Sequence, residues 1–244
     1  MQHRARKRFG QNFLVDDRVV EQIVAAIAPG AGQQILEIGP GQAALTTRLA
    51  ESGADLHLLE IDRDLAASLE RQFSRQDHVH IHRGDALQMD LAALCPDGRF
   101  RLVGNLPYNI STPLIFHLLE WQDRIVDMHF MLQQEVVARM AASPGGKAWG
   151  KLSVMCQYHC SVTPLFNVPP EAFRPVPAVQ STFVRLLPHA RPPVRITDRA
   201  RFERLVTRAA CEGHEVVGCS SLEHLVAQLQ PPRRVMFMIK SGDP

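Results

Sequence analysis

Short apolar segments alternate with segments of helical spacing along the middle of the chain, and this alternation most restricts the possible folds. Strand-like apolar runs occur at Gln34–Ile38, Leu56–Glu60, Val79–His82, Arg101–Val103 and Met128–Leu132. Helical spacing occurs at Ala43–Ala50, Leu65–Phe73, Pro113–Glu120 and Glu135–Ala142. This β–α–β rhythm is typical of a parallel sheet. The sequence therefore predicts an α/β fold.

Two later apolar segments, Val162–Val168 and Thr182–Leu187, are separated by proline-rich sequence that leaves no room for a helix. We expect them to form an antiparallel pair at one edge, which completes a mostly parallel, seven-stranded sheet. A basic arm and a short helix at Val19–Ala28 precede it. The sequence predicts one main domain over 1–188 and a small, reduced C-terminal helical appendage over 189–244.

Length, apolar runs and cysteine spacing exclude several protein classes. No apolar run approaches the roughly 18 to 20 residues that span a bilayer, and the start of the chain lacks the apolar core of a signal peptide. We therefore expect a cytoplasmic protein with no membrane partner. The five cysteines include no Cys-x-x-Cys pair, which argues against a disulfide framework and a zinc knuckle. We predict no metal.

Positive charge is concentrated near both ends of the chain, although the net charge is only +2. Arg4, Arg6, Lys7 and Arg8 form a cluster at the start, and a second basic excess follows residue 184. Such clusters are suited to the phosphate backbone of a nucleic acid. Charge alone is equally compatible with solvated basic ends that have no partner.

The first strand is followed by a glycine turn that carries a carboxylate, in the order Glu37-Ile38-Gly39-Pro40-Gly41. Such a turn lets the backbone approach a ligand closely, and the acid can bind the amino group of an amino acid. Positions 43 and 44 are both alanine, and the third glycine would stand at 44, so the full Gly-x-Gly-x-x-Gly dinucleotide fingerprint is missing. A nicotinamide enzyme is thus a less favoured alternative, and a turn of purely structural glycines is another.

Two further acids follow strand ends and predict a nucleoside ligand. Glu60 ends the second predicted strand 21 residues after Gly39, where an acid accepts the ribose hydroxyls. Asp85 follows the third strand and is placed to accept an adenine amine. Asp62 lies close enough in sequence to be confused with Glu60.

The tetrapeptide Asn105-Leu106-Pro107-Tyr108 after the fourth strand predicts methylation of an aromatic amine. Such an amine is a poor nucleophile, because its lone pair is delocalised into the ring. The side-chain oxygen of Asn105 and the carbonyl of Leu106 can accept its hydrogens. Pro107 stiffens the turn, and Tyr108 offers a face for a flipped-out base. No metal or strong base is needed when a sulfonium methyl donor is positioned.

These motifs resemble the KsgA-type small-subunit ribosomal RNA adenine N6,N6-dimethyltransferases. The likeness runs from about His3 to about Ala210 and is densest at Arg6–Leu14, Glu37–Gly41, Asn105–Asn109, Met128–Gln133, Gly150–Val154 and Val168–Pro175. It implies a class I methyltransferase (Rossmann-like) fold with S-adenosyl-L-methionine as cofactor.

The resemblance also implies roles for individual residues. Asn12, Leu14, Gly39, Glu60, Asp85 and Asn105 would bind the cofactor, Arg4, Arg6, Lys7 and Arg8 would hold RNA backbone, and Tyr108 and Phe173 would sandwich the adenine. A buried core position is the alternative for Phe173.

The family's product is dimethyladenosine at two neighbouring adenosines near the 3′ end of small-subunit (16S) RNA, made within an assembling 30S particle. The alternatives are a large-subunit methyltransferase of the macrolide-resistance type, a catalytically weak ribosome-assembly factor, and a small-molecule N-methyltransferase. Pro40 and Leu106 favour the small-subunit type, and the basic arm disfavours the small-molecule type. We expect a monomer.

The sequence departs from the family pattern after Ala210. It carries Glu212 and Glu215 where family members have a dense Arg/Lys run. Because cations there would contact RNA phosphates, the departure affects docking more than catalysis.

Overall fold

The computed structural model describes residues 10–96, 98–194, 202 and 206, and the chain divides into two compact units. Unit 1 comprises Met1–Gln134 and Thr163–Pro188, and unit 2 comprises Glu135–Val162 and His189–Pro244. Arg4, Arg6, Lys7 and Arg8 lie outside the described residues, as does most of the predicted appendage. Among the described residues, no helix has the length and apolar character needed to cross a bilayer.

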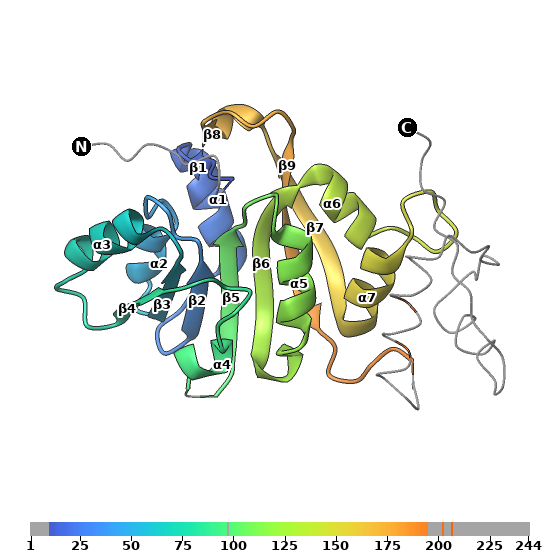
Figure 1. The fold of residues 1–244 in the computed structure, drawn as a ribbon, viewed down its shortest axis with the longest axis horizontal. Helices are drawn as coiled ribbons and strands as arrows, with labels where there is room; N and C mark the ends of the chain where they lie inside the picture. Colours follow the sequence, from blue (N-terminus) through green and yellow to red (C-terminus); the bar gives the residue numbers. More distant parts are fainter. Residues whose placement is uncertain (1–9, 97, 195–201, 203–205, 207–244) are drawn as a thin grey trace. The chain divides into compact units, whose positions relative to one another are not determined.

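The sheet has seven strands in the order β4-β3-β2-β5-β6-β9-β7 (Figure 1). Their bounds are β2 Gln34–Ile38, β3 Asp55–Glu60, β4 Val79–Arg83, β5 Phe100–Asn105, β6 Ile125–Gln133, β7 Cys160–Val168 and β9 Ser181–Pro188. The five strands from β4 to β6 pair in parallel, and β9 pairs antiparallel with β6. The prediction of a mostly parallel seven-stranded α/β sheet is confirmed.

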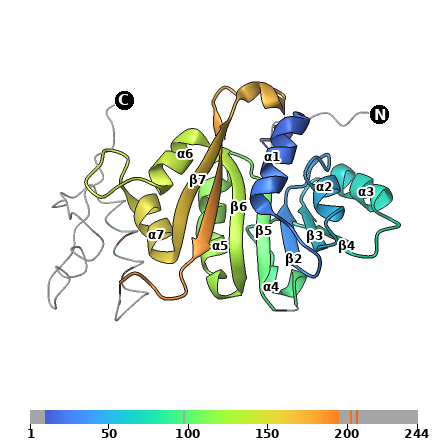
Figure 2. The ribbon, with the colours of Figure 1, turned by 180° about the vertical axis from the view of Figure 1, so that it is seen from behind.

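Helices of unit 1 cover both faces of its sheet. They are α1 Asp17–Ile27, α2 Thr46–Ala50, α3 Arg63–Gln72, α4 Leu91–Leu94 and α5 Ser111–Leu119. Figures 1 and 2 show α1 and α5 on opposite faces. The carboxylate of Asp16 begins α1 by accepting hydrogen bonds from the backbone N–H groups of Arg18 and Val19, at 2.9 and 3.4 Å.

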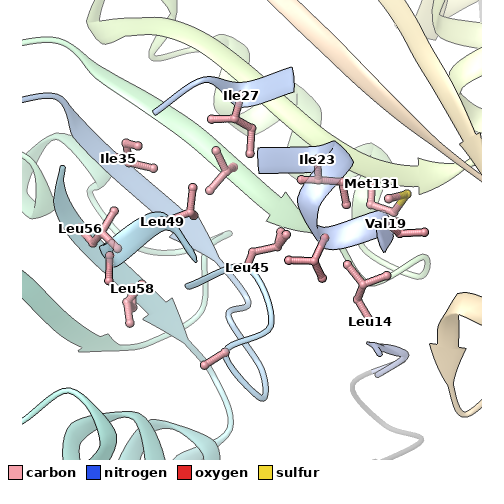
Figure 3. Packing of buried hydrophobic residues seen from close by; sticks show 14 of the residues in the cluster. Leu14, Val19, Ile23, Ile27, Ile35, Leu45, Leu49, Leu56, Leu58 and Met131 are labelled. Atoms are coloured by element: carbon pink, nitrogen blue, oxygen red, sulfur yellow. The ribbon is translucent and has the colours of Figure 1, made fainter. Parts of the chain in front are cut away.

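The core on the α1 face joins this helix to α2, β2 and β3. Figure 3 shows Ile23 and Ile27 of α1, Leu49 of α2, and Ile35 and Leu56 of the strands in one cluster. Four of the five β2 residues are buried. Central parallel strands are covered on both faces, so they carry continuous apolar sequence rather than alternation.

Two features of unit 1 differ from the sequence prediction or were missed by it. Helix α2 begins at Thr46 rather than at Ala43, because Ala43 has a left-handed backbone conformation with φ 66°. The sequence also gave no sign of the two-stranded antiparallel ribbon of β1, Phe13–Leu14, and β8, Phe173–Arg174.

Unit 2 contributes two helices, α6 and α7. Helix α6 spans Gln134–Met140, of which only Gln134 is assigned to unit 1, and helix α7 spans Lys151–His159. The side-chain amide of Gln157 donates to the carbonyl oxygens of Met140 and Ala142, at 2.9 and 2.8 Å, and so joins the two helices. The sequence did not predict α7, because most of its residues are buried and no amphipathic period marks it.

A buried ion pair fixes the amino-terminal ends of β5 and β6 beneath α1. The guanidinium of Arg101 donates to both carboxylate oxygens of Asp127, at 2.8 and 2.9 Å, and to the carbonyl of Ile27 at the end of α1, at 2.6 Å. Burial raises the pKa of Asp127, but the His129 ring, 3.6 Å away, and the hydrogen-bonded guanidinium of Arg101 outweigh it and lower the pKa to about 2.

Replacing Arg101 by methionine should destabilise the fold. We expect Arg101→Met to lower the free energy of unfolding at neutral pH by about 3 kcal/mol, because Asp127 is left charged and buried. The double variant Arg101→Met/Asp127→Leu should recover most of the loss. Because the folded pKa of Asp127 is depressed, the contribution of the pair should fade as the pH falls from about 4 to about 2. Urea unfolding measures each value, and wild-type stability of Arg101→Met would contradict the prediction.

Candidate active site

The carboxyl ends of β2, β3, β4 and β5 border one cavity of about 340 Å³. Chain order reverses between β2 and β5, so the connections that follow these two strands leave in opposite directions and open a crevice. The cavity is lined by five segments of unit 1, namely Gly10–Leu14, residues within Glu37–Leu45, Leu59–Ile61, Gly84–Leu87 and Asn105–Ile110.

Most of the site residues predicted from the sequence meet in this cavity. They are Asn12, Leu14, Gly39, Glu60, Asp85, Asn105, Leu106, Pro107 and Tyr108. Phe173 is not among the lining residues. Its side chain is fully buried in the core of unit 1, and its backbone pairs with Leu14 across the β1–β8 ribbon. In this conformation Phe173 offers no free face, so its stacking role stays a prediction that would require the ribbon to move.

The glycine turn after β2 provides space for a ligand. Gly39 and Gly41 have positive φ angles of 70° and 58°, which side chains other than glycine rarely adopt. A Cβ atom on Gly39 would meet nothing within 4 Å, whereas one on Gly41 would lie 3.1 Å from the Phe13 ring. The turn therefore holds its shape against the N-terminal segment and leaves open space at Gly39.

Two buried carboxylates line the cavity, and the ionised form of each is disfavoured. Burial raises the pKa of Glu37 to about 7, with a lowering hydrogen bond from Thr46 at 2.7 Å and a raising contribution from the charge of Glu60. Burial also raises the pKa of Glu60, although backbone N–H groups of Asp62 and Gly41 donate to it at 2.9 and 3.1 Å. A cation in the cavity would stabilise both carboxylates.

Asp85 and Ile61 complete the wall beside Glu60. One carboxylate oxygen of Asp85 accepts from the backbone N–H of Leu87 at 3.0 Å, and the other accepts from the side chain of Gln88 at 3.3 Å. A carboxylate has about four lone-pair sites, so acceptor capacity remains. Ile61 lines the cavity and is 46% exposed, a large value for isoleucine. The sequence reading overlooked this apolar surface, which suits the face of a flat ring.

The Asn105–Tyr108 turn is held by the N-terminal segment. The side-chain amide nitrogen of Asn105 donates to the backbone carbonyl of Asn12 at 2.8 Å, which leaves the side-chain oxygen as its acceptor. The backbone N–H of Leu106 donates to the carbonyl of Met131 on β6 at 3.2 Å. The turn is thereby fixed from both sides at the end of β5.

Tyr108 has a partner that the sequence reading missed. Its hydroxyl lies 2.7 Å from the hydroxyl of Ser181, at the start of β9. Burial raises the pKa of Tyr108, and the hydrogen bond with Ser181 partly opposes this rise. Ser181 is itself buried. No local sequence signal identifies such a pair, because the two residues are far apart in the chain.

Most of the chain is similar in sequence to ribosomal RNA methyltransferases. Residues 2–217 match the family described as ribosomal RNA adenine dimethylase. Ribosomal RNA small subunit methyltransferase A of Pseudomonas aeruginosa is 57% identical over 209 residues, which are 85% of this chain and 78% of that protein. The protein of the same name from Chromohalobacter salexigens is 56% identical over 212 residues, 85% of this chain and 75% of that protein.

Solved structures agree with the fold. A dimethyladenosine transferase from Plasmodium falciparum superposes with a TM-score of 0.73 at 24% identity, over 84% of this chain and 73% of that chain. The 23S rRNA methyltransferase ErmE superposes with a TM-score of 0.69 at 27% identity, over 82% of this chain and 79% of that chain.

The buried acid Glu37 should make cofactor binding depend on pH. With a pKa of about 7 in the free protein, Glu37 is partly protonated near neutrality. A ligand ammonium group favours the carboxylate, so binding should release a proton, and affinity should rise from about pH 6 and level off above about pH 7.5. Titration calorimetry with S-adenosylmethionine measures this, and Glu37→Gln should bind more weakly with a flat profile. A flat wild-type profile would contradict the prediction.

Proposed function

The chain belongs to the ribosomal RNA adenine dimethylase family, and we propose that it transfers methyl groups from S-adenosylmethionine to the N6 amines of adjacent adenosines near the 3′ end of small-subunit ribosomal RNA. The observation that carries this proposal is that the acidic glycine turn and the Asn105–Tyr108 turn share one cavity. A cofactor bound by the first turn therefore lies beside the acceptors of the second.

The residues present fit S-adenosylmethionine. Its amino group suits the buried carboxylate of Glu37, and its ribose suits Glu60, whose carboxylate is already aligned by two backbone N–H groups. Asp85 and Ile61 border the part of the cavity where we place the adenine ring. When bound, the cofactor supplies a methyl group that its sulfonium has already activated.

Catalysis by the protein then depends on positioning the amine. The hydrogen bond from the Asn105 amide nitrogen to the carbonyl of Asn12 leaves the Asn105 side-chain oxygen as an acceptor, and we propose that it accepts one hydrogen of the amine. We propose that the Leu106 carbonyl accepts the second hydrogen. Two acceptors draw the lone pair out of conjugation, and holding nitrogen and methyl in contact provides most of the acceleration.

Tyr108 supplies the face on which we propose that the flipped-out adenine stacks. Its ring is half-buried beside the cavity, and its hydroxyl is held by Ser181. Stacking on an aromatic ring contributes about 1 to 3 kcal/mol per base, independently of sequence. The choice of adenosine must therefore come from contacts with the surrounding RNA.

We assign RNA backbone contacts to Arg4, Arg6, Lys7 and Arg8, on the strength of their charge. We also propose that the substrate is an assembling 30S particle in the cytoplasm and that the enzyme acts as a monomer. A large-subunit target is disfavoured, because relatives of 56 to 57% identity bear the small-subunit name.

Labelled methyl transfer tests the proposed function and its rivals together. Wild-type protein should label undermodified small subunits, but neither large subunits nor free nucleosides. A catalytically weak assembly factor would bind small subunits without labelling them. Label on large subunits or on free nucleosides would show that the small subunit is not the substrate.

Removing the Asn105 acceptor should abolish most of the transfer. We expect Asn105→Ala to lower kcat by about 100-fold at saturating cofactor, the usual cost of deleting one preorganised hydrogen-bonding group. Asn109→Ala is the matched control, because Asn109 borders the same cavity but is exposed; it should keep most of the wild-type rate. Equal labelling by wild type and Asn105→Ala would refute the mechanism.

Ser181 should act as a positioning residue through Tyr108. The Ser181→Ala variant loses one hydrogen bond of about 1 kcal/mol, so kcat/KM for RNA should fall about fivefold, while cofactor affinity stays unchanged. Tyr108→Phe removes the same hydrogen bond, so its kcat/KM for RNA should fall by the same factor. Adding Ser181→Ala to Tyr108→Phe should then lower kcat/KM no further. Additive losses in this double-mutant cycle would show that Ser181 acts by another route.

A further inference from the structure

Three histidines and one aspartate share one face of β3 and β4, at the edge of the sheet. His57 of β3 is the register partner of His80 of β4, and Leu59 is that of His82. Alternate residues of a strand point to the same side. Asp55 and His57 therefore lie on the same face as His80 and His82. None of these residues lines the cofactor cavity.

The ligand atoms of three of these residues converge. Nε2 of His80 lies 3.0 Å from one carboxylate oxygen of Asp55, and Nε2 of His57 lies 3.5 Å from the other. One ligand atom from each of Asp55, His57 and His80 lies within 4.8 Å of the other two. This spacing admits a single cation among them at ordinary coordination distances of about 2.0 to 2.2 Å.

The fourth residue, His82, orients one of the ligands. Its Nε2 lies 3.1 Å from Nδ1 of His57, and the two rings stack with centroids 5.3 Å apart. When Nδ1–H of His57 donates to His82, the lone pair on Nε2 of His57 faces the Asp55 carboxylate.

Either a proton or a metal cation between Nε2 of His57 and the Asp55 carboxylate removes the repulsion between them, and the convergence of Nε2 of His80 on the same carboxylate gives a metal cation three contacts. We propose that Asp55, His57 and His80 form a site for a first-row divalent cation of borderline softness, with Zn²⁺ as its representative. Two imidazoles and one carboxylate are a ligand set that suits such ions and leaves at least one position for water. His80 is exposed and Asp55 half-buried, so the site can be reached from solvent.

The position of the site gives it a structural consequence. Strand β4 is the edge of the sheet, and only β3 pairs with it among the described strands. A cation held by both strands fastens this edge. Glu60 ends β3, and Asp85 follows β4, so the same two strands carry two of the residues that we assign to the cofactor. Binding to the folded state alone raises its stability.

We predicted no metal from the cysteine spacing and from the chemistry of methyl transfer. Neither observation concerns histidines that come together only when two strands pair.

Zn²⁺ binding to the full chain tests the proposal. The protein is purified without a polyhistidine tag, stripped with EDTA, and titrated with ZnCl₂ by calorimetry, while thermal unfolding is followed with and without the ion. We expect one saturable equivalent that raises the unfolding temperature. Absence of saturable binding, or of any change in unfolding temperature, would overturn the site.

Variants identify the ligands. His80→Gln and Asp55→Asn should each abolish tight binding and the thermal shift, whereas His82→Gln should weaken binding about tenfold, as loss of an orienting partner does. His78→Gln is the matched control, because its ring contacts the carbonyl of Ala50 at 3.1 Å instead; it should bind like wild type. Wild-type binding by His80→Gln and Asp55→Asn, or equal weakening in His78→Gln, would show that scattered histidines hold the ion.

Discussion

The direct pairing of β2 with β5 is the contact on which the rest of the site depends. Glu37 of β2 pairs in parallel with Val103, immediately before Gly104 and Asn105. A Cβ atom at Gly104 would lie 2.6 Å from the carbonyl oxygen of Ile38, so the close approach of the two strands requires glycine. Because chain order reverses here, the turns after β2 and β5 separate and leave the cavity between them.

The N-terminal segment closes that cavity through contacts that are distant in sequence. The β1–β8 ribbon ties it to the segment before β9, and the Asn12 carbonyl receives the amide of Asn105. Burial of Phe173 against the core then holds the ribbon in place. Ser181, only a few residues later, holds Tyr108. The stretch from β8 to the start of β9 thus positions both the N-terminal wall of the cavity and the Asn105–Tyr108 turn.

Sequence reasoning succeeded where one segment carries the whole signal. The strand–turn spacing around Gly39 and the order Asn105-Leu106-Pro107-Tyr108 depend on local chemistry. Parallel topology places both turns at the same edge of the sheet, and the pairing of β2 with β5 brings them together. It missed the β1–β8 ribbon, the Tyr108–Ser181 pair and the histidine face, because each is created by register between segments distant in the chain. Helix α7 was not predicted for another reason. Burial on nearly all sides removes the amphipathic periodicity from which a helix is predicted.

Electrostatics distinguishes the ligand class more sharply than the glycine pattern does. A dinucleotide would bring a pyrophosphate to the turn after β2, where Glu37 and Glu60 are both buried beside the cavity. The negative charge of the pyrophosphate would then lie close to two acidic side chains in a poorly solvated part of the protein, and these like charges would repel each other. S-adenosylmethionine carries a sulfonium and an ammonium, and positive charge in the cavity favours the ionised form of a nearby carboxylate, which opposes the effect of burial on the two pKa values. Two carboxylates whose ionised forms are disfavoured by burial in the free protein therefore favour a cationic ligand over an anionic one.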